Sequence, residues 1–136
     1  MPNNHILVVD DDDDLRGTIC SFLSRSGYKT SEANDGYKAI KSIYDEQPIL
    51  IITDIMMPEK EGIGMIMDIR RDFKDEIKII AVSGGGQFTS SFVLRSARSL
   101  GADAVMAKPF DFDELLHTVE TVLQDFPQSD IIQKQP

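Results

Sequence analysis

Residues 49–53 read Ile-Leu-Ile-Ile-Thr, and this apolar run stops at a carboxylate, Asp54. The run lacks polar–apolar alternation, which is typical of a short strand buried on both faces of a parallel sheet. Three further apolar runs also stop at polar residues: Ile6–Val9 before Asp10 and Asp11, Ile77–Val82 before Ser83, and Ala104–Ala107 before Lys108. Because ligands of an open parallel sheet bind beyond the carboxyl ends of the strands, these carboxylates, hydroxyl and ammonium should meet at one edge.

Segments with helical periodicity lie between these runs. In the first segment Leu15, Ile19, Phe22 and Leu23 repeat at i, i+4, i+7 and i+8 and form one apolar stripe, which Gly27 ends. The other expected elements are helices around Ala39–Tyr44, Gly62–Phe73, Val93–Leu100 and Phe112–Leu123, and a weaker strand at Tyr28–Ala33. Strand and helix therefore alternate along the whole chain.

The expected helix ends and inner faces follow from side-chain chemistry. Gly101 lies beyond the fourth helix as a C-cap, and Asp111 is an N-cap of the fifth helix, with Glu114 three residues later. The positions expected to face inward are Ala39, Ile40, Ile43 and Tyr44 in the second helix, Ile66, Ile69 and Phe73 in the third, Val93, Ala97 and Leu100 in the fourth, and Phe112, Leu115, Leu116, Val119, Val122 and Leu123 in the fifth.

This alternation predicts an α/β fold, a doubly wound parallel sheet with helices on both faces. A length of 136 residues is that of one ordinary domain, so we expect no second catalytic or DNA-binding module. The domain is expected to span residues 1–125. Residues 126–136 are polar apart from Ile131 and Ile132 and are expected to form a loose tail, with a short docking segment as the alternative.

Charge and composition restrict the class of protein. A net charge of -9 argues against nonspecific nucleic-acid binding, which needs surplus lysine and arginine. No apolar stretch approaches the roughly 20 residues needed to span a bilayer. One cysteine, Cys20, cannot form an internal disulfide and is expected to be packed, and the chain opens without a basic segment followed by a long apolar one. We therefore expect a cytoplasmic protein with no membrane contact.

The acidic run from Asp10 to Asp14 divides into two parts. Asp12, Asp13 and Asp14 are interpreted as a solvated loop and first helical turn, where the helix dipole favours negative charge. Asp10 and Asp11 directly follow a strand, where adjacent carboxylates repel each other unless a cation intervenes, and Mg²⁺ suits such oxygen ligands. Asp54, at a neighbouring strand end, can act as a nucleophile toward phosphorus.

The remaining candidates are less specific. Ser83 and the glycines after it could be a helix cap and a flexible loop, and they form no Walker phosphate loop. Lys108 precedes Pro109, which pushes it into extended geometry, and the bond between them can be cis or trans. His5 and His117 are expected to be exposed to solvent.

Taken together, these motifs resemble the receiver domain of two-component response regulators. The resemblance runs from about Ile6 to Leu123 and rests on residues that occur in order at the expected strand ends. They are Leu7-Val8-Val9-Asp10-Asp11, Asp54 followed by Met57-Pro58 and Gly62, Ser83-Gly84, and Lys108-Pro109-Phe110. The resemblance implies a flavodoxin-like, five-stranded sheet of order 2-1-3-4-5 with five helices.

The resemblance also implies roles for individual residues. Asp54 would accept a phosphoryl group from a phosphohistidine on a sensor histidine kinase or histidine phosphotransfer protein. Asp11, Asp54 and the backbone carbonyl of Met56 would hold Mg²⁺, for which Mn²⁺ can substitute, and Asp10 would help through water. Lys108 and Ser83 would contact the phosphoryl oxygens. The chain would be no enzyme beyond self-phosphorylation from phosphodonors and slow self-dephosphorylation.

The implied signal leaves by contact with a downstream protein at the face formed by the fourth helix, fifth strand and fifth helix. Val105 stands where such domains usually carry a Tyr or Phe that swings inward, so that aromatic is absent; Phe88 or Phe92 could replace it. Two alternatives follow. One is a receiver-like module that binds a partner constitutively. The other is a haloacid-dehalogenase-type phosphatase, but its motif requires Thr or Val where Asp14 stands, and a late acidic pair is not evident.

Overall fold

The computed structural model describes residues 3–55, 61–84 and 90–124, and the side chains within these ranges except at 61–62 and 90–94. The elements are β1 (His5–Val9), α1 (Asp13–Arg25), β2 (Lys29–Ala33), α2 (Gly36–Asp45), β3 (Leu50–Asp54), α3 (Glu61–Phe73), the 3₁₀ turn η2 (Lys74–Glu76), β4 (Lys78–Ser83), α4 (Ser90–Leu100), β5 (Ala104–Ala107) and α5 (Phe112–Leu123). The strands form one five-stranded sheet of order β2-β1-β3-β4-β5, and every pairing between neighbouring strands is parallel.

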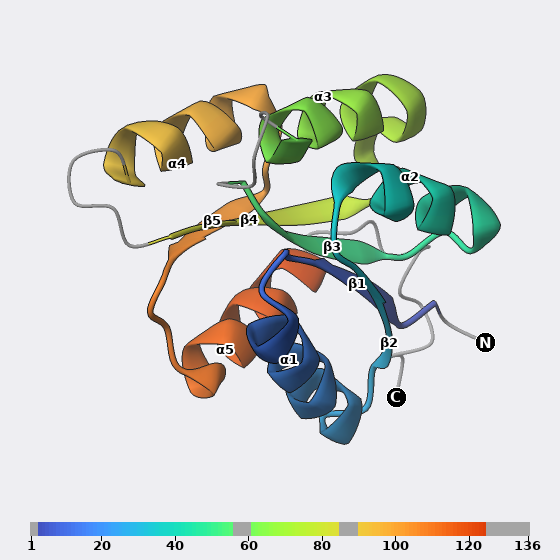
Figure 1. Ribbon diagram of the computed structural model, residues 1–136, viewed down its shortest axis with the longest axis vertical. Coiled ribbons are helices and arrows are strands. Elements are labelled where there is room, and N and C mark those ends of the chain that lie inside the picture. The colour runs from blue at the N-terminus through green and yellow to red at the C-terminus, as the bar shows by residue number, and fades with distance from the viewer. Residues whose placement is uncertain (1–2, 56–60, 85–89, 125–136) are drawn as a thin grey trace.

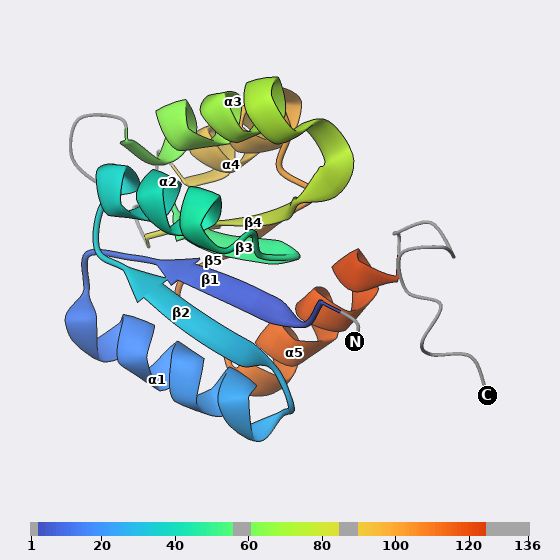
Figure 2. The ribbon, with the colours of Figure 1, turned by 90° about the vertical axis from the view of Figure 1, so that its right-hand side faces the viewer.

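Helices cover both faces of this sheet (Figure 1). The helices α2, α3 and α4 lie on one face, and α1 and α5 lie on the other, as the side view also shows (Figure 2). The doubly wound fold and its strand order, predicted from the sequence and its resemblance, are therefore confirmed.

Alternate residues of the central strands enter two separate hydrophobic cores. In β1, Leu7 and Val9 belong to the core under α2, α3 and α4, whereas Ile6 and Val8 belong to the core under α1 and α5. All four side chains are at most 1% exposed. Burial on both faces explains why these runs contain no polar alternation, because neither face meets water.

Polar caps and glycines set the ends of the helices. Asp12 caps α1 by accepting from the Leu15 amide, and Asp111 caps α5 by accepting from the Glu114 amide at 2.7 Å. Gly101, directly after α4, has φ of 126°, a conformation that side chains with a Cβ rarely adopt. The predicted cap at Asp111 and the predicted stop at Gly101 are both confirmed.

Three expectations about individual side chains were wrong. His5 is only 3% exposed, because β1 begins at this residue and its ring bonds Ser31 in β2. Tyr44 is 63% exposed, because the buried face of α2 is narrow and centres on Ala39 and Ile43. Leu100 is 38% exposed, since it is the last residue of α4.

The expectations for Cys20 and His117 are confirmed. Cys20 is buried in α1, and burial raises the pKa of its thiol to about 11, as befits a packed cysteine. His117 is exposed as predicted. Among the residues that the structure describes, no helix combines the length and apolar character needed to cross a bilayer. Residues 126–136, expected to form a loose tail, lie outside the described ranges.

Candidate functional site

The loop between β1 and α1 presents two aspartates at the carboxyl end of β1, beside the central strand β3. Asp10 is buried, with 3% of its surface exposed, and its Oδ1 accepts from the Asp12 amide at 2.9 Å. Its own amide donates to the Ala33 carbonyl at the end of β2. Asp11 follows and is exposed. The short loop therefore turns one carboxylate inward and leaves the next at the surface.

Asp54 is the last residue of β3, the strand between β1 and β4. It is 6% exposed and pairs in register with Val82. The sequence analysis placed Asp54 just after its strand and Ser83 just after β4, but both are the last residues of these strands. This shift of one residue leaves both side chains at the predicted edge.

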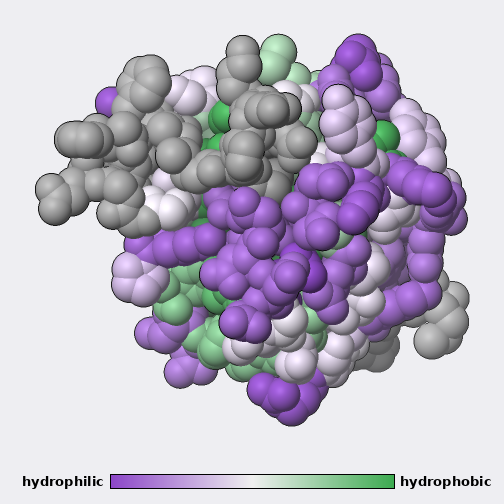
Figure 3. Space-filling view, viewed as in Figure 1, coloured by the Kyte–Doolittle hydropathy of each residue, from purple (hydrophilic) through white to green (hydrophobic). Residues whose placement is uncertain are grey.

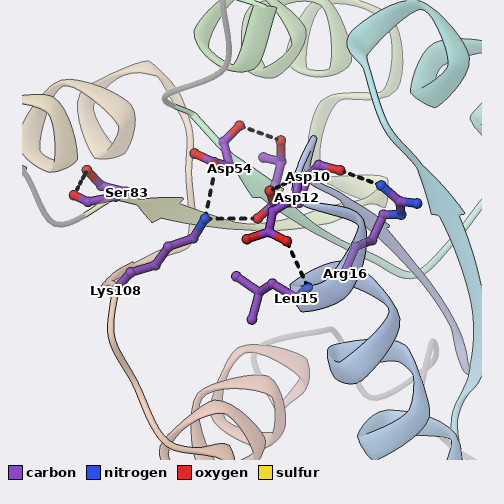
Figure 4. Close-up of polar contacts among 9 residues, drawn as sticks. Asp10, Asp12, Leu15, Arg16, Asp54, Ser83 and Lys108 are labelled. Atoms are coloured by element: carbon purple, nitrogen blue, oxygen red, sulfur yellow. Dashed lines mark hydrogen bonds and ion pairs between the residues drawn. The ribbon is translucent and has the colours of Figure 1, made fainter.

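Lys108 joins the two buried aspartates. It follows β5 and forms the cis peptide bond with Pro109, and its amide donates to the Ser83 carbonyl at 2.8 Å. Its Nζ lies 3.0 Å from Oδ2 of Asp10 and 3.0 Å from Oδ2 of Asp54 (Figure 4). Residues 98 and 54 positions away in sequence thus meet at one ammonium.

The electrostatics of Lys108 follow from these contacts. Burial lowers the pKa of the ammonium, but the hydrogen bonds to Asp54 and Asp10 outweigh this, so the pKa lies above the ordinary value for lysine. Lys108 therefore carries a full positive charge at neutral pH.

Ser83 lies at the same edge but does not join this group. Its side chain is buried and its Oγ donates to the Gly84 carbonyl at 3.2 Å, away from the Lys108 ammonium (Figure 4). The structure brings together Asp10, Asp11, Asp54 and Lys108, and it leaves the hydroxyl of Ser83 turned toward its own loop.

Asp10, Asp11 and Asp54 form what we call the acidic cluster. Each offers a carboxylate oxygen, and these oxygens lie within 4.8 Å of one another. Such oxygens suit Mg²⁺, which is bound by one or two carboxylates together with waters. Three carboxylates face the single ammonium of Lys108, so the donor set fits a divalent cation that would neutralise the remaining negative charge. The predicted carbonyl ligand at Met56 lies outside the described residues.

The surface around the acidic cluster is polar. Figure 3 shows hydrophilic residues gathered at the centre of the face on which the carboxyl ends of the strands lie. Beside the acidic run, Arg16 contacts both Asp10 and Glu32, a pairing that the sequence analysis missed. The sequence shows only a basic residue within the first helical turns, and its partner in β2 is 16 positions away.

Val105, which stands in place of the usual aromatic, lies in β5 and packs there as an aliphatic side chain. It is partly buried, pairs in register with Ala81 and packs on the core under α2, α3 and α4. Phe88 lies outside the described residues, as does the side chain of Phe92.

A doubly wound sheet with an acidic cluster and a lysine at its carboxyl edge is the arrangement that the resemblance to receiver domains implies. The family of response regulator receiver domains matches residues 6–120. The chain therefore belongs to this family, and the alternative of a haloacid-dehalogenase-type phosphatase is wrong. Receiver domains are signalling domains that interact with histidine kinases or phosphotransfer proteins, and they generally bind Mg²⁺ at an acidic pocket.

Solved structures agree with this assignment. The receiver domain of NtrX from Brucella abortus is 31% identical, with a TM-score of 0.82, over 89% of this chain and 99% of that chain. A putative response regulator from Chloroflexus aurantiacus is 26% identical, with a TM-score of 0.80, over 91% of this chain and 99% of that one.

Curated relatives differ in length. A probable transcriptional regulator, ycf27, from Guillardia theta is 34% identical over 119 residues, which are 88% of this chain but 45% of the relative. The chain thus spans about half the length of most of the curated relatives that it matches. Sporulation initiation phosphotransferase F from Bacillus subtilis is 29% identical over 123 residues, which are 90% of this chain and 96% of that protein.

Proposed function

We propose that this protein is a phosphorylation-activated switch of a two-component or phosphorelay system, with Asp54 as the phosphoacceptor. One observation carries the proposal: the Lys108 ammonium bridges Asp10 and Asp54 within a cluster of three carboxylates. Family membership supplies the donor class, a phosphohistidine on a sensor histidine kinase or phosphotransfer protein.

In the proposed transfer, a carboxylate oxygen of Asp54 forms a bond to phosphorus. The bond from phosphorus to the histidine nitrogen breaks, and its electron pair stays on the imidazole, so that an acyl phosphate forms. Lys108 already lies beside Asp54 and is placed to pair with a phosphoryl oxygen. A bound Mg²⁺ or Mn²⁺, held by Asp10, Asp11, Asp54 and the Met56 carbonyl, would neutralise charge on the carboxylates and phosphoryl oxygens.

Ser83 is proposed to sense the phosphoryl group. Its hydroxyl now donates to the Gly84 carbonyl, a weak local bond that it can exchange for a bond to a charged phosphoryl oxygen. That exchange would draw the end of β4 toward Asp54 and couple the site to the segment that follows.

The signal is proposed to leave through contact with a downstream protein at the face formed by α4, β5 and α5. We propose residues 1–125 as the receiver unit, acting in the cytoplasm without contact to nucleic acid. The relative from Bacillus subtilis, matched over 96% of its length, supports action without an attached module. A constitutive interaction module is the second candidate function. Val105 favours it, because an aliphatic side chain cannot act as the aromatic that swings inward.

Acetyl phosphate tests the proposal without the unknown kinase. The protein is incubated with acetyl phosphate and Mg²⁺, and its intact mass is compared with that of an Asp54→Asn variant. The wild type is expected to gain one phosphoryl group and the variant none. An adduct on the variant but not on the wild type would overturn the assignment of Asp54, and no adduct on either would favour the constitutive module.

A further inference from the structure

The loop that carries Asp11 is contacted by the side chain of Arg16, through the backbone carbonyl of Asp10. Arg16 lies in the second turn of α1, and its side chain is 14% exposed. Its Nη1 donates to the carbonyl oxygen of Asp10 at 2.8 Å, and its Nε donates to Oε1 of Glu32 in β2 at 2.8 Å (Figure 4 shows the first contact). Nη1 also lies 2.8 Å from Asp13.

These contacts connect three segments. The guanidinium joins α1, the end of β1 and the edge strand β2, and the acceptors fix its orientation because its donors form a planar fork. Glu32 and Asp13 raise the pKa of Arg16, with the hydrogen bond to Glu32 as the largest cause, so the group stays charged.

The contact to Asp10 is made at its backbone. The carboxylate of Asp10 bonds instead to Lys108 and to the Asp12 amide. Arg16 therefore stabilises the loop conformation through a carbonyl, and does so without bonding the Asp10 carboxylate that belongs to the acidic cluster. Because the peptide unit is planar, the orientation of the Asp10 carbonyl also sets the orientation of the backbone amide of Asp11, the next residue.

We propose that Arg16 is a positioning residue for cation binding, which presents Asp11 beside Asp10 and Asp54. This inference rests on the proposed function, since it assumes that the acidic cluster binds Mg²⁺. Residues that orient metal ligands through hydrogen bonds commonly change metal affinity by about 10- to 100-fold when they are replaced.

The sign of the effect separates positioning from simple electrostatics. By Coulomb's law, removing a positive charge near the acidic cluster should tighten Mg²⁺ binding. A positioning role predicts the opposite, because the carboxylate of Asp11 would no longer be held beside the others. The direction of change in affinity therefore decides between the two.

The experiment is titration of the metal-free protein with Mg²⁺ by calorimetry. Arg16→Ala is expected to bind Mg²⁺ about 10-fold more weakly than the wild type. Arg16→Lys, which keeps the charge but cannot contact Asp10, Asp13 and Glu32 together, is expected to bind more weakly as well. Unchanged or tighter binding in Arg16→Ala, or wild-type affinity in Arg16→Lys, would overturn the inference.

Controls address folding and charge. Lys29→Ala removes a cation from β2 at its other end, where it pairs with the exposed Glu46, and is expected to leave Mg²⁺ affinity unchanged. Amide hydrogen exchange at Asp12 and Leu15 in metal-free protein should be faster in Arg16→Ala and in Arg16→Lys, a readout that needs no bound metal. Protection equal to that of the wild type would contradict a positioning role.

Failure of the inference can be told from failure of the proposed function. If the wild type binds Mg²⁺ and gains a phosphoryl group while Arg16→Ala binds equally well, only the role of Arg16 is wrong. If the wild type neither binds Mg²⁺ nor gains mass from acetyl phosphate, the proposed function is wrong and this inference is wrong with it.

Discussion

At the carboxyl end of the sheet one lysine contacts two aspartates, and at the amino end an arginine and a lysine pair with one aspartate. Lys108 bonds Asp10 and Asp54, and Asp11 completes the acidic cluster beside them. Arg70, in the last turn of α3, bonds Asp103 just before β5 at 2.7 Å. Both groups are largely shielded from water.

At the amino end the charge of Asp103 is fully compensated, because Lys78 Nζ also lies 3.9 Å from its carboxylate. The Arg70 guanidinium also donates to the carbonyls of Gly101, Lys74 and Ile77, and Asp103 accepts from the Ile79 amide as well. Gly101 is required here, since a Cβ would lie 2.7 Å from the Arg70 side chain. We call these contacts the Arg70 network, which joins α3, η2, α4 and the starts of β4 and β5.

Among the described residues, the acidic cluster at the carboxyl end has excess negative charge. Its three carboxylates lie close together, and the Lys108 ammonium contacts two of them, so their repulsion costs stability unless a cation binds. Shielded ion pairs stabilise the fold where every charged group has its partners, whereas an excess of one sign favours the binding of an ion of the opposite charge.

The largest expected effect on the free energy of unfolding comes from breaking the Arg70 network at the amino end of the sheet. Arg70→Ala should lower the free energy of unfolding by roughly 3 kcal/mol, because it leaves Asp103 and three carbonyls without their shared donor. Urea denaturation measures this. Arg71→Ala is the matched control, since the neighbouring Arg71 is 68% exposed and its loss should lower the free energy of unfolding far less. Equal losses in the two variants would refute the assigned role of the network, and Mg²⁺ should rescue neither variant.

The next effect concerns Mg²⁺ at the carboxyl end. At a Mg²⁺ concentration about 100-fold above its dissociation constant, the wild type should gain about 2.7 kcal/mol in the free energy of unfolding. Asp11→Asn should lose this gain. In metal-free buffer the same variant should be more stable than the wild type by up to about 1 kcal/mol, because one repelling carboxylate is gone.

Denaturation with and without Mg²⁺ checks both parts of this prediction. A metal-free Asp11→Asn protein that is less stable than the wild type would show that repulsion within the acidic cluster is not a cost. Retention of the full Mg²⁺ effect would show that Asp11 is not a ligand.

The smallest effect is a pH dependence at the amino end. Burial is the largest cause that lowers the pKa of His5, and Lys29 lowers it further while Glu46 opposes. The unfolded chain then binds more protons than the folded one, so stability is full above the ordinary histidine pKa of about 6.5 and falls as the pH drops from there toward the lowered pKa.

The slope in that window should be at most about 1.4 kcal/mol per pH unit. It is measured by urea denaturation in steps from about pH 7.5 to about pH 5.5, a range chosen around the ordinary histidine pKa. His5→Gln should reduce the slope, and His117→Gln, at an exposed position of α5, should keep it. The prediction fails if the two variants show the same slope.

Much of the fold could be predicted because its causes are local or topological. The strand runs are apolar on both sides, the expected cap at Asp111 bonds the amide three residues on, and Gly101, expected to end a helix, has positive φ. Parallel strands bring their carboxyl ends together, so Asp10, Asp54 and Lys108 could be placed at one edge without knowledge of any distance.

Side-chain surroundings were predicted less well. The burial of His5 depends on Ser31 in the neighbouring strand. Tyr44 stays at the surface, where its hydroxyl donates to Asp72 and its ring contacts Phe73, and both partners belong to α3. Arg70 and Arg16 were missed because their acidic partners are 33 and 16 positions away, and nothing in a single sequence pairs them.

The sequence by itself determined the alternation of strands and helices along the chain, the burial of the sheet on both faces and the residues at its carboxyl edge. These follow from hydrophobic periodicity and from the rule that ligands bind at the carboxyl ends of parallel strands. Only the tertiary structure decided that Lys108 bridges Asp10 and Asp54, that Ser83 bonds its own loop, and that Arg16 and Arg70 support opposite ends of the sheet. Burial patterns are encoded along the chain, but hydrogen bonds between distant charged groups depend on distances and directions that exist only once the chain has folded.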